Sequence, residues 1–254
     1  MLHLGDLRRN TAKPADSPSE GAVADWPARF AELAGQVRDA RLRDFYACPI
    51  PDGTTPLEAV PMLALDVETT GLDPLRDEIL SIGAVPMDAT TIRASASRYW
   101  IVRPRAPLNP ESVTIHAITD SQIASAPDLA DVIGELLALM AGRIVVVHCR
   151  EIERAFLDSA LRTRLGEGIE FPAIDTMALE ARVYRRRPRG FLDRLLGRRA
   201  EAISIRLADS RSRYGLPRYR AHHAPTDALA TAELLQAQLA HRYARDTPLG
   251  MLWS

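Results

Sequence analysis

The sequence is poor in three features that would define other classes of protein. It has two cysteines, Cys48 and Cys149, which excludes a disulfide framework and favours a reducing compartment. No apolar run approaches the roughly 18 residues that a membrane span needs, and the first ten residues lack the apolar core of a signal peptide. Lysine occurs once, at Lys13, so arginine carries nearly every positive charge. We therefore expect a cytoplasmic protein with no membrane partner.

Length and charge set broad limits on what the chain can be. Its 254 residues suit one domain of ordinary size with an extension, and 46% hydrophobic residues is typical of a globular protein. The formal net charge of -1 does not by itself indicate a nucleic-acid partner. The arginines are unevenly placed, because residues 182–220 hold 13 of them against 3 acids, an excess of 13 − 3 = 10. This stretch is either a solvated surface or a segment that helps to hold a phosphate backbone.

Residues 1–60 differ in composition from the rest of the chain. Residues 1–24 carry Pro, Ser, Asp and Gly without periodicity and are expected to form a mobile tail. Asp25 can cap a helix with Pro27 in its first turn, so we expect one amphipathic helix and a linker over residues 25–60. The apolar positions of this helix are Trp26, Phe30, Leu33, Val37 and Phe45. The helix is expected to pack on the rest of the protein or to dock a protein partner.

The remaining sequence alternates between strand-like and helix-like segments. Three strands that read as a meander come first, at residues 62–68, 78–85 and 97–102. A helix, a strand and further helices follow, at residues 127–140, 143–147, 150–165, 174 onward, 191–199 and 224–243. A meander followed by strand–helix alternation predicts an α/β protein in which helices flank a mixed sheet.

Two acidic residues end the first of these strands. Asp66 and Glu68 follow an apolar run that begins at Met62, and because side chains alternate across a strand, both point to the same face as Ala64. Neighbouring carboxylates on a buried strand repel each other and lose hydration, and a divalent cation would compensate both effects. A strand end that frays into solvent, with both acids hydrated, would also fit this segment on its own.

Two later segments supply what such a site still lacks. Residues 145–157 read as a strand that runs into a helix, and residues 222–227 open the last long helix. Together with residues 62–72, and in this order, they resemble the motifs of the DEDDh (DnaQ-like) 3′→5′ exonucleases, a family of polymerase proofreading subunits and RNA-trimming enzymes. The resemblance covers about residues 60–243, so residues 61–245 are expected to form an exonuclease domain.

The resemblance implies an RNase H-like fold and a site for two Mg²⁺ or Mn²⁺ ions. The ligands would be Asp66, Glu68, Glu153 and Asp227, hard oxygen donors that suit these ions better than zinc. By the same resemblance, Asp66 would bridge both ions, and His222 would be the general base that takes a proton from the attacking water. Two divalent ions about 4 Å apart can clamp the attacking and leaving oxygens of a phosphodiester.

The third acid departs from the usual pattern of the family. An aspartate usually stands five residues after the histidine of this motif, and that position, counted from His148, is Glu153. Helix spacing supports the choice, because Glu153 shares a face with Leu157, whereas Glu151 and Asp158 are rotated away from it. Glutamate keeps the charge and adds one methylene, which puts the affinity for the second ion in question.

The last segment offers two histidines and one acid. His222 stands five residues before Asp227, which is the spacing of the family, and His223 is one residue too close and is expected to face elsewhere. Pro225 suits a first helical turn, and Asp227 in that turn gains from the helix dipole.

The resemblance also implies contacts to the substrate. Thr69, Thr70, Gly71 and Leu72 follow the first two acids and would touch the 3′-terminal nucleotide, unless they only form the turn that leaves the strand. His116 lies in a segment that resembles a family segment near the site, and it would face the substrate or make a structural hydrogen bond.

We therefore expect a metal-dependent 3′→5′ exonuclease that acts on single-stranded DNA or RNA 3′ ends, with DNA favoured, and releases nucleoside 5′-monophosphates. The N-terminal helix could dock a polymerase or another protein. Three alternatives remain open: an exoribonuclease that trims RNA, a non-catalytic module that binds nucleic-acid ends or a partner on the same fold, and a hydrolase of small nucleotides.

Overall fold

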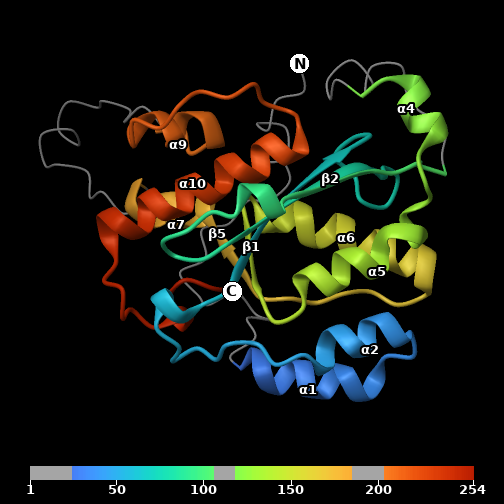
Figure 1. Ribbon diagram of the computed structural model, residues 1–254, viewed down its shortest axis with the longest axis horizontal. Coiled ribbons are helices and arrows are strands. Elements are labelled where there is room, and N and C mark those ends of the chain that lie inside the picture. The colour runs from blue at the N-terminus through green and yellow to red at the C-terminus, as the bar shows by residue number, and fades with distance from the viewer. Residues whose placement is uncertain (1–24, 106–117, 185–202) are drawn as a thin grey trace, which may run out of the picture.

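A five-stranded mixed sheet forms the centre of the protein in the computed structural model, which describes residues 25–105, 118–184 and 203–254 (Figure 1). The strands are β1 (Met62–Thr69), β2 (Ile79–Met87), β3 (Arg98–Ile101), β4 (Ile144–Val147) and β5 (Ala173–Asp175). Their order is β3-β2-β1-β4-β5. The meander β1-β2-β3 is antiparallel, and β4 runs parallel to β1 and to β5. The expected mixed sheet with flanking helices is confirmed.

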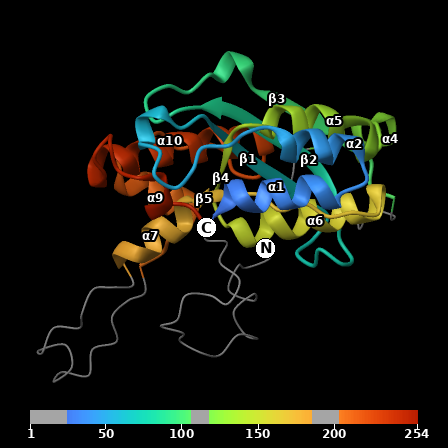
Figure 2. The ribbon, with the colours of Figure 1, turned by 90° about the horizontal axis from the view of Figure 1, so that it is seen from below.

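Helices cover the sheet on both sides (Figure 2). The long helix α10 lies across β1 and β2, and α5 packs between α6 and α2. In chain order the helices are α1 (Trp26–Gln36), α2 (Ala40–Ala47), α4 (Asp120–Ser125), α5 (Leu129–Met140), α6 (Arg150–Leu165), α7 (Thr176–Tyr184), α9 (Leu207–Arg213) and α10 (Ala224–Arg242), with short 3₁₀ turns at Leu57–Ala59, Ala94–Ala96 and Leu249–Met251. Within these described residues, no helix combines the length and the apolar character that crossing a membrane would take.

The N-terminal region contains two helices where the sequence predicted one. The chain turns at Val37, whose backbone is extended, and α2 then begins after Asp39, whose side chain accepts a hydrogen bond from the Arg41 N–H (2.9 Å). The Glu167 carboxylate accepts from the backbone N–H groups of Arg38 and Asp39, at 2.9 and 2.8 Å. Because side chains satisfy these donors, the chain can leave the helix here at little cost.

The apolar side chains of this helix pair are buried inside the protein. The rings of Phe30, Phe45 and Tyr46 lie 5.0–5.2 Å apart, and Trp26 is also buried. A partner cannot dock on these side chains while they are packed, which removes the simplest form of the predicted docking role. The division into residues 25–60 and 61–245 stays a prediction, and the predicted mobile tail lies outside the described residues.

The strand β5 is the other difference from the predicted elements. The sequence predicted that Ile174 opens a helical stretch, but Ala173–Asp175 pairs with β4, and only then does α7 begin. On its other edge, the backbone of Ala173 exchanges hydrogen bonds with Ser254. A strand of three residues is too short to show an alternating pattern, so the sequence showed only the helix that follows it. The predicted helix at 191–199 lies outside the described residues.

Gly83 explains how α10 comes so close to the sheet. A Cβ atom on this residue of β2 would lie 2.3 Å from the carbonyl carbon of Ala224 and 2.4 Å from the nitrogen of Pro225. Both are backbone atoms at the start of α10, so no side chain can rotate away to make room. The absence of a side chain at position 83 thus sets the position of the first turn of α10, which carries Asp227.

Gly83→Ala is therefore expected to destabilise the fold and to displace Asp227. Overpacking of a well-packed site costs about 1–3 kcal/mol, and each kcal/mol lowers the melting temperature by about 2–4 °C in a protein of this size. Thermal denaturation checks this, with Gly35→Ala as the matched control. A Cβ at Gly35 meets nothing within 4 Å, and alanine there should raise helix stability by about 0.5–1 kcal/mol. Equal melting temperatures for the two variants would contradict the packing argument.

Candidate active site

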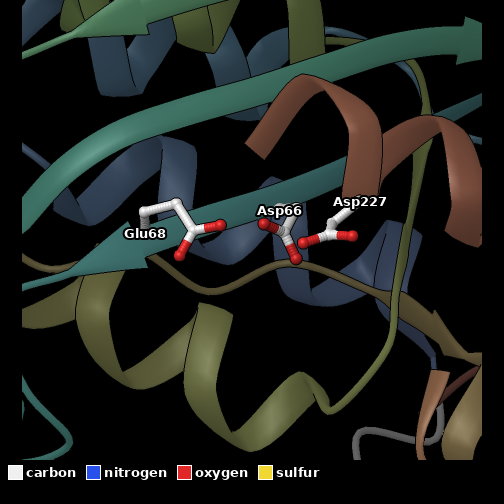
Figure 3. A group of neighbouring side chains, drawn as sticks. All are labelled: Asp66, Glu68 and Asp227. Atoms are coloured by element: carbon white, nitrogen blue, oxygen red, sulfur yellow. The ribbon is translucent and has the colours of Figure 1, made fainter. Parts of the chain in front are cut away.

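Three carboxylates from two distant segments meet above the end of β1. Asp66 and Glu68 lie opposite Gly83 and Ser81 of β2, on the face of the sheet that α10 covers. Asp227 comes down from the first turn of α10 (Figure 3). Each of the three side chains offers an oxygen, and these atoms all lie within 4.8 Å of one another. Such a spacing suits joint coordination of a cation by hard oxygen donors.

The electrostatics of this cluster are unfavourable without added positive charge. Burial raises the pKa of Asp66 well above its ordinary value, and the neighbouring carboxylates of Glu68, Asp227 and Glu153 raise it further. Burial also raises the pKa of Asp227, where Glu68 adds to the effect and the N–H groups of the preceding turn oppose it. Like charges this close resist ionisation together, so the cluster calls for a compensating cation.

Glu153 lies beside this cluster but is not one of the three residues whose oxygens converge. It belongs to the first turn of α6, is 4% exposed, and its Oε2 has no hydrogen-bond partner among the residues that the structure describes. Burial raises the pKa of this carboxyl well above its ordinary value. The adjacent arginines serve other groups, since Arg150 pairs with Asp175 (3.4 Å) and Arg154 donates to the Phe171 carbonyl (2.7 Å). An unpaired buried carboxylate oxygen is costly, and a cation would supply the missing partner.

The turn before α10 places its two histidines differently. His222 is exposed and adopts φ 65°, a left-handed conformation that is uncommon outside glycine. Its backbone N–H donates to Asp227 Oδ2 at 2.7 Å, which helps to hold that conformation. The ring of His223 is instead tied down, because its Nδ1 lies 2.8 Å from Thr226 Oγ1 and its ring centroid is 5.3 Å from that of Tyr99.

The turn after β1 is held by its own side chains. Thr69 Oγ1 donates to the Gly71 carbonyl (2.6 Å), and Thr70 Oγ1 donates to Asp77 Oδ1 (3.2 Å). A Cβ on Gly71 would lie 2.4 Å from Asp77 Oδ2, so a larger residue there would require the Asp77 side chain to move. Leu72 remains 38% exposed at its end. His116, the other predicted substrate contact, lies outside the described residues.

Tyr99 is a residue at the site that the sequence did not single out. It lies opposite Gly83, which lies opposite Asp66, so all three belong to one row across β3, β2 and β1. Its side chain is 39% exposed. Burial raises the pKa of Tyr99 and the nearby Glu68 carboxylate raises it further. Alternation alone could place Tyr99 and Trp100 on opposite faces, but the register that brings Tyr99 level with Asp66 is a tertiary property.

Solved structures of known nucleases share this fold. The fold is shared with the nuclease domain of 3'hExo, a DEDDh family member solved bound to rAMP, at a TM-score of 0.59 and 16% identity, with 72% of this chain and 92% of that one covered. Exonuclease I gives a TM-score of 0.60 at 17% identity over 71% of this chain and 41% of its own. At these identities the likeness establishes the fold class only.

The family is established by sequence. Residues 63–235 match the exonuclease family RNase_T, and the chain belongs to that family. The DNA polymerase III subunit epsilon of Treponema pallidum is 28% identical over 72% of this chain and 79% of its own length. The PolC-type DNA polymerase III of Thermotoga petrophila is 29% identical over 70% of this chain, which spans only 12% of that protein. The predicted resemblance is thus confirmed, and the protein is an enzyme of the exonuclease family.

Proposed function

We propose that the protein hydrolyses phosphodiester bonds at the 3′ ends of single-stranded DNA and releases nucleoside 5′-monophosphates, using two Mg²⁺ or Mn²⁺ ions. The observation that carries this proposal is the convergence of Asp66, Glu68 and Asp227, with oxygens mutually within 4.8 Å, beside the buried Glu153. Four carboxylates of this kind suit hard divalent cations better than zinc, for which nitrogen and sulfur ligands are more usual.

The residues have distinct roles in this mechanism. Asp66, Glu68, Glu153 and Asp227 hold the cations, which when bound stabilise negative charge on the phosphate and provide a hydroxide-like nucleophile at neutral pH. His222 accepts the proton that the attacking water loses. Its exposure on a turn that is tied to Asp227 supports this role, since the imidazole can reach solvent and remains next to an acid of the cluster.

The turn at residues 69–72 is proposed to receive the 3′-terminal nucleotide. Leu72, exposed at 38%, would pack against the base, and the backbone of Gly71 would approach the sugar. The hydrogen bonds that the Thr69 and Thr70 hydroxyls make within this turn pre-organise it, which lowers the entropy cost of binding. His116 keeps its predicted place on the substrate side as part of the same proposal.

The choice of DNA rests on the relatives. Those named above are DNA polymerase III proteins, which supports a DNA substrate and a polymerase partner for this chain. Because the polymerases of the PolC type are much longer than the part that this chain matches, both points remain proposals. RNA trimming is the second candidate, and the same experiment ranks the two.

Degradation of a 5′-labelled single-stranded DNA, and of the matching RNA, tests the proposal. Each substrate is incubated with Mg²⁺, Mn²⁺ or EDTA, with Asp66→Asn protein as the control. The expected result is a ladder that shortens from the 3′ end of the DNA, depends on the cation and is absent in the variant. A ladder on RNA alone would transfer the function to RNA trimming. If folded protein shortens neither substrate, the mechanism is wrong.

Glu153→Gln is expected to raise the Mg²⁺ or Mn²⁺ concentration needed for half-maximal activity by about tenfold or more. The change removes the charge and keeps the shape, and the lost charge-assisted contact is worth roughly 1.5–3 kcal/mol. A cation titration of nuclease activity measures it. Glu151→Gln is the matched control, because Glu151 is on the same helix with its side chain 66% exposed and should leave the curve unchanged.

Glu153→Asp shortens the side chain to the residue that the family usually has, and it should restore most of the cation affinity that Glu153→Gln loses. Full activity at ordinary cation concentrations in both Glu153→Gln and Glu153→Ala would show that another acid completes the site.

A further inference from the structure

Four arginines of the Arg-rich segment, residues 182–220, fall into two groups according to their partners. Arg211 pairs with Glu233 and Arg213 pairs with Glu180, both at 2.7 Å. Both acids lie outside the segment, so its local charge excess is smaller than the sequence count of ten. These two arginines form ion pairs within the protein, so their charges are not available to a polyanion.

Arg218 and Arg220 behave differently. Both are exposed, and neither forms an ion pair with any residue in the described part of the chain. They stand four and two residues before His222, which limits their backbone to within roughly 14 Å of it. The connection that carries them runs from α9 back to the start of α10 (Figure 1). Two positive charges without an ion-pair partner among the described residues therefore lie next to the turn that leads to the carboxylate cluster.

The backbone of this connection is fixed by a contact between α9 and α10. The Tyr219 hydroxyl donates to Glu233 Oε1 (2.9 Å), and the Arg211 guanidinium lies 4.6 Å from the centre of the Tyr219 ring. Arg211, only 3% exposed, also donates to the carbonyl oxygens of Pro217 (2.9 Å) and Ala230 (2.6 Å). Tyr219 stands between the two exposed arginines, so this contact anchors both of them to α10.

An anionic site that acts on a polyanion needs positive charge at its entrance. The carboxylate cluster repels every phosphate that the cations do not neutralise, and exposed arginines can pair with phosphates in bidentate geometry. We propose, resting on the proposed function, that Arg218 and Arg220 bind phosphates of the single strand on the 5′ side of the scissile bond. Tyr219 positions them through its contacts to Arg211 and Glu233. The anchored backbone reduces the entropy that binding costs.

The test compares two substrates that are cleaved at the same carboxylate cluster, one with many phosphates and one with a single phosphate. The full-length Arg218→Gln/Arg220→Gln variant is assayed on a 12-nucleotide single-stranded DNA and on the nitrophenyl ester of thymidine 5′-monophosphate, which has no further phosphates. We expect kcat/KM on the DNA to fall by about tenfold for each arginine, mainly through KM, and activity on the ester to stay within about twofold. The slope of log affinity against log salt should drop by about 0.7 for each lost contact.

A charge-matched variant controls for the loss of positive charge itself. Arg38 is exposed in the turn between α1 and α2, and Arg43 is exposed on α2, so Arg38→Gln/Arg43→Gln should change the kinetics on neither substrate. Equal loss on DNA and ester, or no loss on DNA, would overturn the assignment of Arg218 and Arg220. Inactivity of the unmodified protein on both substrates would instead reject the proposed function, and the salt slope of DNA binding measured in EDTA would still decide the role of the arginines.

The anchoring role of Tyr219 has its own readout. Tyr219→Ala leaves the charge unchanged and should lower kcat/KM on the DNA but not on the ester. Tyr219→Phe keeps the ring against Arg211, loses the hydrogen bond to Glu233, and should recover most of the activity. Melting temperatures establish that the variants are folded. Wild-type kinetics on DNA in folded Tyr219→Ala protein would show that the arginines do not depend on this anchor.

Discussion

Asp66→Asn is expected to abolish nuclease activity and, at the same time, to stabilise the protein in EDTA. The variant keeps the shape of the side chain and removes the charge at the centre of the cluster. The loss of activity should exceed the about 10²–10³-fold that removal of one stabilising hydrogen-bond donor costs in other enzymes, because a whole cation site depends on this oxygen pair. The ladder assay on 5′-labelled DNA measures it.

The stability gain has a definite dependence on pH. The pKa of Asp66 is raised in the folded protein by burial and by its acidic neighbours, so folding becomes less favourable as pH rises above the unfolded value of about 3.9. This penalty is fully present above the folded pKa and disappears as pH falls below the unfolded one. Asparagine carries no such penalty. The melting temperature of Asp66→Asn in EDTA should therefore exceed that of the unmodified protein at pH 7.5 and approach it in acid.

Cations should stabilise the unmodified protein more than Asp66→Asn, so they should reduce or reverse the difference in melting temperature seen in EDTA. A ligand at 100 times its Kd stabilises a fold by about 2.7 kcal/mol, which corresponds to roughly 5–10 °C for a chain of this length. The unmodified protein should show such a shift with Mg²⁺ or Mn²⁺ at pH 7.5, and Asp66→Asn should show much less. Thermal denaturation with and without cation gives this readout independently of catalysis.

Asp88→Asn provides a control of opposite sign. Burial alone would raise the pKa of Asp88, but donors on Thr90, Thr91 and Arg93 outweigh it and lower that pKa to about 2. A depressed folded pKa contributes stability above the unfolded pKa, so this variant should melt lower at pH 7.5 while retaining nuclease activity. Undiminished cleavage by Asp66→Asn, or an equal cation shift in both proteins, would remove Asp66 from the site.

The sequence predicted the parts of the site that depend on local geometry. The spacing of Asp66 and Glu68 on a strand, of Glu153 in a first helical turn and of Asp227 after Pro225 all follow from periods of 2.0 and 3.6 residues. The structure forms these elements at those positions. Their convergence could be expected only through the family resemblance, because no local pattern fixes how α10 crosses the sheet. Gly83, which permits that crossing, looked like any other strand residue in the sequence.

What the sequence could not predict depends on partners distant along the chain. The excess of arginine at 182–220 left open either a solvated surface or a segment that holds a phosphate backbone, and Glu180 and Glu233 neutralise two of its members. The break between α1 and α2 depends on a carboxylate more than a hundred positions away, Glu167. Tyr99 joins the site through strand register. In each case the deciding contact is tertiary, and composition or periodicity carries no record of it.

His222→Asn is expected to lower kcat by about 10²–10⁴-fold, the usual contribution of general acid–base catalysis, and to leave the cation-induced melting shift unchanged. Asparagine tolerates the left-handed backbone that His222 adopts at φ 65°, so the turn and its N–H bond to Asp227 should persist while the basic nitrogen is lost. Steady-state kinetics on single-stranded DNA, together with thermal denaturation, separate the loss of a base from a loss of structure.

The neighbouring histidine, His223, provides the matched control for His222→Asn. His223 has the same side chain one residue later, but its ring is bound to Thr226 and lies against Tyr99. His223→Asn should therefore cost less than about tenfold in kcat, with any effect reflecting a loosened turn. If His223→Asn costs more than His222→Asn, the base has been assigned to the wrong ring. If both cost little, the proton leaves through solvent, and the carboxylates with their cations account for catalysis alone.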